Sequence, residues 1–137
     1  MTREVLARKL ARLQALLADL HPHAGKSVDE VFDDHYEIER ILELLVQVGV
    51  DIVSHDLAER DLVPDSYRGA FLEAGRHGLI PADLAASLAD AAGLRNVLVH
   101  LYEIIDYEIV TASVGRALED FGRFVRIYTS RLEDSQS

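Results

Sequence analysis

Apolar residues recur three and four positions apart along almost the whole chain, and this spacing constrains the fold more than any other feature. Near the N-terminus the leucines are Leu6, Leu10, Leu13, Leu17 and Leu20. An α-helix has 3.6 residues per turn, so this spacing lines apolar side chains along one face. No stretch alternates apolar and polar residues with the period of two that is typical of a β-strand. The sequence therefore predicts an all-α fold.

Start and stop signals divide the chain into helices. Ser27 and Glu30 have the Ser-x-x-Glu spacing of a capping box, Pro81 suits a first helical turn, and Asp106 can cap the last helix. The predicted helices span residues 5–20, 28–57, 67–74, 81–104 and 107–132. Long helices joined by short breaks indicate an up-and-down bundle of four main helices plus a short extra helix.

Length and composition suit one domain. The chain has 137 residues, of which 49% are apolar and 28% charged, and we expect residues 1–137 to form a single domain with residues 133–137 as a frayed tail. No apolar stretch approaches the roughly 20 residues of a membrane span, and the N-terminus lacks the pattern of a signal peptide. The sequence contains no cysteine, which excludes disulfides and thiolate chemistry. A cytoplasmic location is the expectation.

The charge distribution limits the partners. The formal net charge of -10 argues against a protein that coats nucleic acid through bulk electrostatics, so we expect neither DNA nor a membrane as partner and only local contacts with RNA. Residues 29–65 contain twelve carboxylates, against only Arg40 and Arg60. This segment is either a solvated acidic face or a surface for a basic partner.

One stretch near residue 100 contains the most informative polar side chains. On the helix predicted for residues 81–104, successive residues are rotated by about 100°. The polar residues that then fall on one side are Arg95, Asn96, His100, Tyr102 and Glu103. The apolar residues that fill the opposite side are Leu94, Val97, Leu98, Leu101, Ile104 and Ile105. The helix is therefore predicted to bury one side and to present the polar set together.

These residue types suit cleavage of a phosphodiester bond without a metal ion. His100 is of the residue type that most often serves as general acid or base, and it can transfer a proton between a ribose 2′-hydroxyl and a leaving oxygen. Arg95 offers a planar fork of donors to phosphate oxygens, while Asn96 and Tyr102 can orient the reacting groups. Transesterification uses both a base and an acid, which favours a two-fold homodimer with a shared site. The same pattern is also typical of a solvent-exposed helical face, so spacing alone leaves the chemistry open.

The motif Arg95-x4-His100-x-Tyr102 resembles the signature of HepT-like toxins of the HEPN superfamily. The likeness extends to residues 51–55, 79–81 and 105–108 and covers about residues 38–132. It implies a HEPN-like domain and a metal-independent endoribonuclease toxin of a HepT/MNT toxin–antitoxin system.

The resemblance also implies roles and partners. Arg95 and His100 take the catalytic roles at a composite site in the homodimer interface, and Asn96 supports them. The partner is an MNT-like nucleotidyltransferase antitoxin, which in some members transfers AMP to the motif tyrosine, here Tyr102. No cofactor is implied. The alternatives are a HEPN-like subunit that binds a nucleotidyltransferase without cutting RNA and a plain helical adaptor.

Two weaker signals concern metals and cationic patches. His21, His23 and His35 have carboxylates nearby, but inward-facing Glu-x-x-His pairs are missing from the sequence. We therefore predict surface and loop histidines and no metal site. Cationic residues gather on the predicted last helix, at Arg116, Arg123 and Arg126, and on the predicted first helix, at Arg3, Arg8, Lys9 and Arg12. They either contact RNA phosphates or, as we favour, balance the acidic surface.

Overall fold

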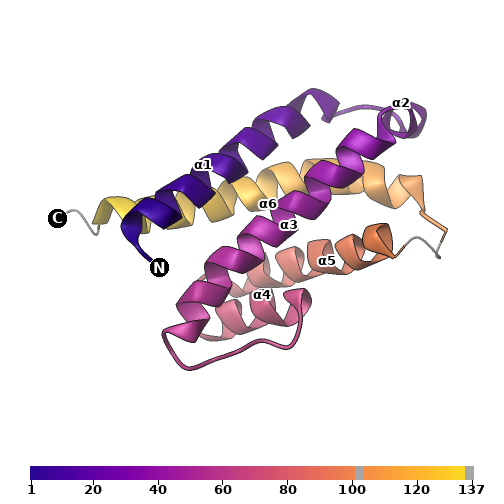
Figure 1. The fold of residues 1–137 in the computed structure, drawn as a ribbon. Coiled ribbons are helices and arrows are strands. Elements are labelled where there is room, and N and C mark those ends of the chain that lie inside the picture. The colour runs from indigo at the N-terminus through magenta and orange to yellow at the C-terminus, as the bar shows by residue number, and fades with distance from the viewer. Residues whose placement is uncertain (101–103, 135–137) are drawn as a thin grey trace.

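The long helices of the protein lie side by side with their apolar faces turned inward (Figure 1). The computed structural model describes residues 1–100 and 104–134. Its elements are α1 (Arg3–Leu20), the 3-10 turn η1 (His21–His23), α2 (Val28–Asp33), α3 (His35–Ala58), α4 (Tyr67–Arg76), α5 (Ala82–Val99) and α6 (Tyr107–Asp134). Within these two ranges there is no strand, so the all-α prediction is confirmed.

The predicted bundle of four main helices is also confirmed. Helix α1 packs against α3 and α6, while α3 also contacts α4 and α5. Figure 1 shows α6 running in the opposite direction to both α1 and α5, with the short α4 beside α5. Large aromatic side chains fill the core, among them Phe71 and Phe121, whose rings meet edge to face with centroids 6.5 Å apart. Burial of such side chains is the main stabilising contribution to a bundle of this kind.

The structure corrects the single helix predicted for residues 28–57. The capping box of Ser27 and Glu30 opens a helix as expected, but Asp34 leaves the helical conformation, with φ −111° and ψ 25°. Its carboxylate accepts a hydrogen bond from Lys26 Nζ at 2.9 Å, which ties the break to the preceding loop. The buried Ile38 keeps the apolar spacing across the break, so the spacing does not reveal it. The segment therefore forms two helices, α2 and α3.

The helix predicted for residues 81–104 is likewise too long. Helix α5 ends at Val99, and His100 has a non-helical backbone with φ −89° and ψ 90°. Leu98 is the last buried residue of α5, whereas Val99 and His100 are exposed, so core packing no longer favours a helix there. The chain must also reverse direction before α6 begins at Tyr107, and a helix to residue 104 would leave two residues for that reversal.

Side-chain contacts hold the start of α6. Asp106 Oδ1 accepts a hydrogen bond from the Glu108 N–H at 2.9 Å, which confirms Asp106 as a cap. The Tyr107 hydroxyl donates to Glu39 Oε2 at 3.2 Å, and the same carboxylate oxygen lies 2.6 Å from His35 Nδ1. Burial and then the charge of Glu39 raise the pKa of Tyr107, so its hydroxyl stays protonated as a donor. This network joins α6 to α3 at the end of the bundle.

Helices α4 and α5 approach each other closely. A Cβ added at Gly75 would collide with the Cβ of Ala85, so a larger residue would push the two helices apart. At the other end of α4, the Ser66 hydroxyl accepts a hydrogen bond from the Gly69 N–H at 2.9 Å and caps the helix. The close packing fixes the position of Tyr67, the first residue of α4, relative to α5.

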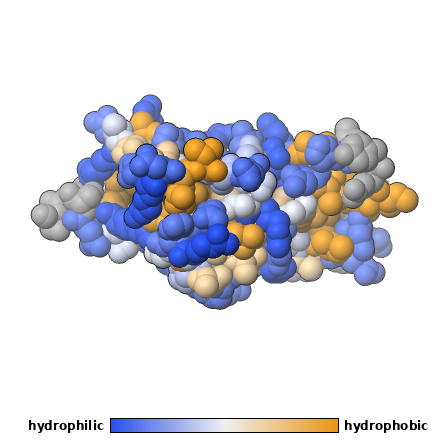
Figure 2. All heavy atoms as spheres, turned by 90° about the horizontal axis from the view of Figure 1, so that it is seen from below, coloured by the Kyte–Doolittle hydropathy of each residue, from blue (hydrophilic) through white to orange (hydrophobic). Residues whose placement is uncertain are grey.

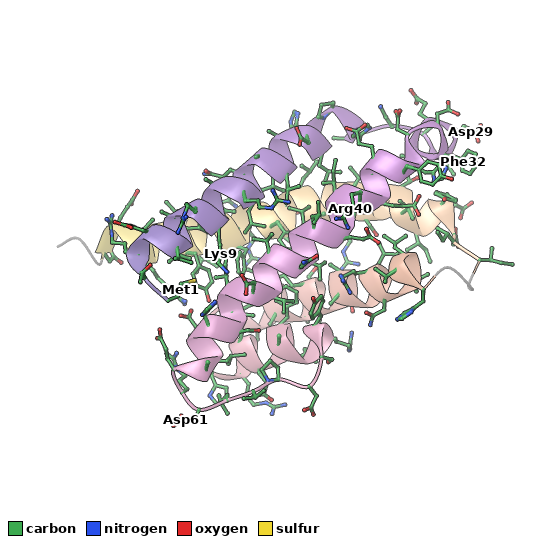
Figure 3. The ribbon with its side chains drawn as sticks, viewed as in Figure 1. Met1, Lys9, Asp29, Phe32, Arg40 and Asp61 are labelled. Carbon is green, nitrogen blue, oxygen red and sulfur yellow. The ribbon has the colours of Figure 1, made fainter. Side chains whose placement is uncertain are left out.

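Ion pairs on the surface add little to this core. Lys9 of α1 pairs with Asp51 of α3 between the two helices (Figure 3), and the N-terminal amine lies 3.1 Å from a Glu59 carboxylate oxygen. Exposed pairs of this kind contribute about 0–1 kcal/mol each. The packing of apolar side chains, rather than these charges, therefore stabilises the arrangement.

Three further expectations can be compared with the structure. Helix α6 extends to Asp134, two residues into the segment predicted to fray, while residues 135–137 lie outside the described ranges. His23 is 6% exposed and lies 3.0 Å from Lys26 Nζ, so the prediction of a surface histidine is wrong there. In the part of the chain that the structure describes, no helix has the length and apolar content to cross a membrane.

Candidate active site

Arg95 lies on the last two turns of α5, next to residues that hold the helix in the core. Leu98 is buried, and Leu94 and Val97 are half-buried. Asn96, the next residue after Arg95, is exposed. The apolar side of α5 is thus buried, as predicted, up to the point where the helix ends.

The side chain of Arg95 is stacked on an aromatic ring. Its guanidinium carbon lies 4.4 Å from the centre of the Tyr67 ring. Arg95 Nε is buried and has no hydrogen-bond partner among residues 1–100 and 104–134. Arg95 as a whole remains half-buried, so solvent still reaches other parts of the side chain. The sequence did not predict Tyr67, which is 28 positions away in the chain, as part of this site.

The charge of Arg95 is not offset by a carboxylate in the described part of the chain. Three arginines are half-buried there, and two of them form ion pairs. Arg123 pairs with Asp83 at 3.0 Å and Arg131 with Asp56 at 3.7 Å. Among residues 1–100 and 104–134, the contact that the structure shows for the Arg95 guanidinium is the face of the Tyr67 ring. A half-buried cation that no described carboxylate neutralises is suited to an anionic ligand such as a phosphate.

His100 lies directly after the helix rather than on it. Its backbone N–H still donates to the Asn96 carbonyl at 3.1 Å, but its backbone then turns away from the helical path. His100 is thus the C-cap of α5, one residue beyond its last helical residue, and the predicted common face of Arg95 and His100 stays a prediction. His100 is exposed, and Tyr102 lies outside the described residues.

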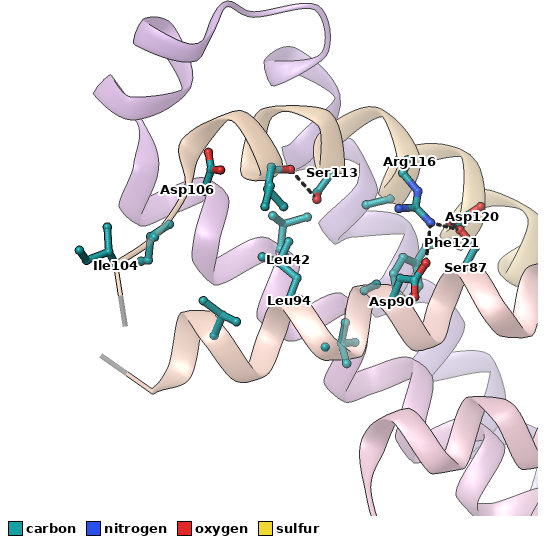
Figure 4. A pocket seen from close by; sticks show the side chains of 17 residues that line it. Leu42, Ser87, Asp90, Leu94, Ile104, Asp106, Ser113, Arg116, Asp120 and Phe121 are labelled. Atoms are coloured by element: carbon teal, nitrogen blue, oxygen red, sulfur yellow. Dashed lines mark hydrogen bonds and ion pairs between the residues drawn. The ribbon is translucent and has the colours of Figure 1, made fainter. Parts of the chain in front are cut away.

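A groove of about 430 Å³ runs between α5, α6 and α3 (Figure 4). Leu42 and Leu94 point into its apolar part, and Ile104 lies at its outer end. At the other end, Arg116 donates to Ser87 Oγ at 2.8 Å and lies 3.3 Å from Asp90 Oδ2. Arg95 and His100 are not among the lining residues, so this groove and the predicted catalytic residues occupy different sides of α5.

Large apolar side chains are exposed where α5 ends and α6 begins. The exposed fractions are 41% for Val99, 98% for Ile104 and 55% for Ile109. Figure 2 shows hydrophobic surface at the same end of the molecule, where α5 ends and α6 begins. We name these three residues the apolar collar. Ile104 was predicted to be buried on the helix, and this prediction is wrong because the helix stops before it.

The weaker sequence signals can also be placed. Within the described ranges no group of three His, Cys, Asp or Glu side chains is arranged to hold a metal ion. Arg116 and Arg123 of α6 pair with Asp90 and Asp83 of α5. Asp83 in turn has its pKa lowered, chiefly by the hydrogen bond from Arg123. These pairs favour the interpretation that the cationic patch on α6 balances acidic residues.

The chain is similar to known ribonucleases over most of its length. The family model for HepT-like ribonucleases matches residues 7–127, which extends the similarity to α1. A tRNA nuclease HepT of Aphanizomenon flos-aquae is 35% identical over 133 residues, covering 93% of this chain and 90% of that protein. An mRNA nuclease HepT of Shewanella oneidensis is 28% identical over 123 residues, covering 89% of each.

Solved structures share the fold. A tri-AMPylated Shewanella oneidensis HEPN toxin in complex with MNT antitoxin superimposes with a TM-score of 0.83 at 24% identity, covering 95% of this chain and 99% of that one. A toxin–antitoxin structure with AMP-PNP gives a TM-score of 0.81 at 23% identity, covering 93% and 98%. The match to the family model over residues 7–127 shows that the chain belongs to the HepT-like ribonuclease family and is an endoribonuclease.

Proposed function

We propose that the protein is the toxin of a toxin–antitoxin pair and cuts RNA with Arg95 and His100 contributed by two copies of the chain. The observation that carries this proposal is the half-buried guanidinium of Arg95, which no carboxylate neutralises in the described ranges. A phosphodiester brings the negative charge that the described residues do not supply at this position. His100, five positions after Arg95 in the chain, is exposed, and we propose that it reaches the same substrate.

The chemistry is a transesterification at phosphorus. The His100 imidazole of one copy takes the proton of the ribose 2′-hydroxyl, and the 2′-oxygen forms a bond to phosphorus. The bond from phosphorus to the 5′-oxygen breaks, and the second His100, protonated, gives that oxygen its proton. The products are a 2′,3′-cyclic phosphate and a 5′-hydroxyl. Arg95 donates to the phosphate oxygens as their negative charge grows.

Two copies are needed because each chain has one histidine in the motif. The apolar collar gives them a surface on which to associate, since exposed Ile104 and Ile109 lose contact with water when they are buried against a partner. A two-fold axis near this end of the bundle would place two copies of His100 close to each other. The homodimer thus supplies both the base and the acid.

Cleavage in the presence of a chelator tests this function. The purified chain is expected to cut RNA equally fast with and without excess EDTA, because imidazole and guanidinium groups perform each step without a metal ion. Mass analysis of the fragments is expected to find 2′,3′-cyclic phosphate ends. Fragments that end in a 3′-hydroxyl, or cleavage that needs added Mg²⁺, would contradict the mechanism.

We further propose that a nucleotidyltransferase antitoxin inactivates the enzyme by transferring AMP to Tyr102. The Tyr102 hydroxyl would attack the α-phosphorus of ATP, with pyrophosphate as the leaving group. An AMP group two residues from His100 adds a phosphate and a nucleoside where RNA must bind. The fold shared with a tri-AMPylated toxin in complex with MNT antitoxin supports this proposal.

Co-expression with an MNT-type nucleotidyltransferase tests the modification. The intact mass of the wild-type chain is expected to rise by whole AMP groups, and RNA cleavage is expected to fall. The Tyr102→Phe variant should keep its unmodified mass and resist inactivation, while Tyr36→Phe, which alters an exposed tyrosine outside the motif, serves as the control. Full addition of AMP to Tyr102→Phe would refute Tyr102 as the acceptor.

A further inference from the structure

The aromatic ring beneath Arg95 comes from a different helix and is held there by the α4–α5 packing. Tyr67 is the first residue of α4, directly after the Ser66 cap, and it is half-buried against the core. Its ring centre lies 4.4 Å from the Arg95 guanidinium carbon. The contact therefore depends on the position of α4 relative to α5, which the close approach at Gly75 sets.

Stacking restricts the arginine without using its outer donors. A ring beneath a guanidinium occupies one face of the planar group, while its N–H bonds point outward in the plane. Arg95 Nε is the covered part of this plane and has no partner in the described ranges. Within the described ranges, the donors on the two terminal nitrogens remain for a phosphate, which guanidinium groups bind with two parallel hydrogen bonds.

A second arginine that stacks on a tyrosine uses its donors within the protein. The Arg131 guanidinium carbon lies 4.8 Å from the centre of the Tyr128 ring. Arg131 also donates to the Leu79 carbonyl and pairs with Asp56, so its donors are occupied within the protein. Within the described ranges, Arg95 has the aromatic ring but neither a carboxylate nor a carbonyl partner. The ring is thus present at an arginine whose donors no described residue occupies.

We propose that Tyr67 is a positioning residue for RNA cleavage: its ring holds the Arg95 guanidinium with the outer donors directed to the substrate phosphate. The proposal rests on the function proposed above. It predicts that an aromatic ring at position 67 is required and that the tyrosine hydroxyl is not. Tyr67→Phe therefore acts like the wild type, whereas Tyr67→Leu and Tyr67→Met release Arg95.

Two measurements on the full chain test this role. In nitrogen-15 NMR, the Arg95 Nε–H signal, assigned by its loss in Arg95→Lys, should exchange slowly with water in wild type and Tyr67→Phe and rapidly in Tyr67→Leu. In steady-state cleavage of an RNA oligonucleotide in EDTA, Tyr67→Leu should lower kcat about 10-fold with little change in KM. Thermal unfolding identifies a leucine variant that fails to fold, in which case Tyr67→Met replaces it. Tyr36→Leu is the control for loss of an exposed tyrosine.

The outcomes separate this inference from the function on which it rests. Slow Nε–H exchange in the folded leucine variant would overturn it whether or not the protein cuts RNA. The inference would also be overturned if Nε–H exchange is rapid in Tyr67→Leu while its kcat is unchanged, provided that Arg95→Ala is inactive. If Arg95→Ala is as active as wild type, the assignment of Arg95 fails, while the NMR signal still reports whether Tyr67 holds its guanidinium.

Discussion

Replacing Arg95 with alanine is expected to slow RNA cleavage about 100-fold or more, and His100→Ala is expected to do the same. Loss of Arg95 removes the charge that stabilises the phosphate as it becomes more negative, an effect of about 100- to 1000-fold for comparable donors. Loss of His100 removes the proton transfers, which contribute a similar factor. Initial rates on one RNA oligonucleotide in EDTA measure both effects.

An arginine and a histidine at the end of α4 provide matched controls. Arg76 is an exposed arginine that pairs with Glu73 at 2.8 Å, and His77 is exposed and also faces Glu73. Arg76→Ala and His77→Ala should cut RNA at the wild-type rate, since neither is placed at the site. The assignment fails if Arg95→Ala or His100→Ala, correctly folded by circular dichroism, keeps wild-type activity.

Replacing Ile104 with aspartate is expected to dissociate the proposed homodimer and abolish cleavage. Ile104 is 98% exposed in the single chain, so the substitution leaves the core intact. In the dimer it would bury an unpaired carboxylate in an apolar surface, and we expect dimerisation to weaken about 100-fold or more. Without the second copy, each site lacks one histidine. Sedimentation velocity measures the dissociation, and the cleavage rate measures its consequence.

Val63 offers the matching control for this substitution. It is 87% exposed in the segment between α3 and α4, outside the apolar collar. Val63→Asp introduces the same charge and should leave the dimer and the activity unchanged. A stable dimer of Ile104→Asp would show that the collar is not the interface. A monomer with full activity would show that one chain contains the complete site.

The positions of most helices were determined by local sequence. Apolar spacing placed α1 and α6 within two residues of their observed ends, and the Ser27 and Asp106 caps were recognised correctly. These features depend on residues one or two turns apart, which interact in any helix that contains them. The motif of Arg95 and His100 was also visible, because its residue types and their spacing are local properties.

Contacts beyond one helix decided where the long predicted helices break or end. The break at Asp34 depends on Lys26 across a loop, and the end of α5 at Val99 depends on the reversal into α6. Apolar spacing predicts neither the break at Asp34 nor the end of α5, since a continuous helix would have the same spacing. The exposure of Ile104 follows from that early end.

The sequence by itself determined the all-α class and the residues suited to cut RNA, because helical periodicity and side-chain chemistry depend on residues close together in the chain. Only the tertiary structure decided that Tyr67 lies beneath Arg95, that no described carboxylate neutralises this arginine, and that His100 stands beyond the helix. The reason is physical: the close packing of α4 on α5 brings Tyr67 to Arg95, and the reversal of the chain into α6 ends α5 before His100. The spacing of residues along one helix does not determine how closely another helix packs against it.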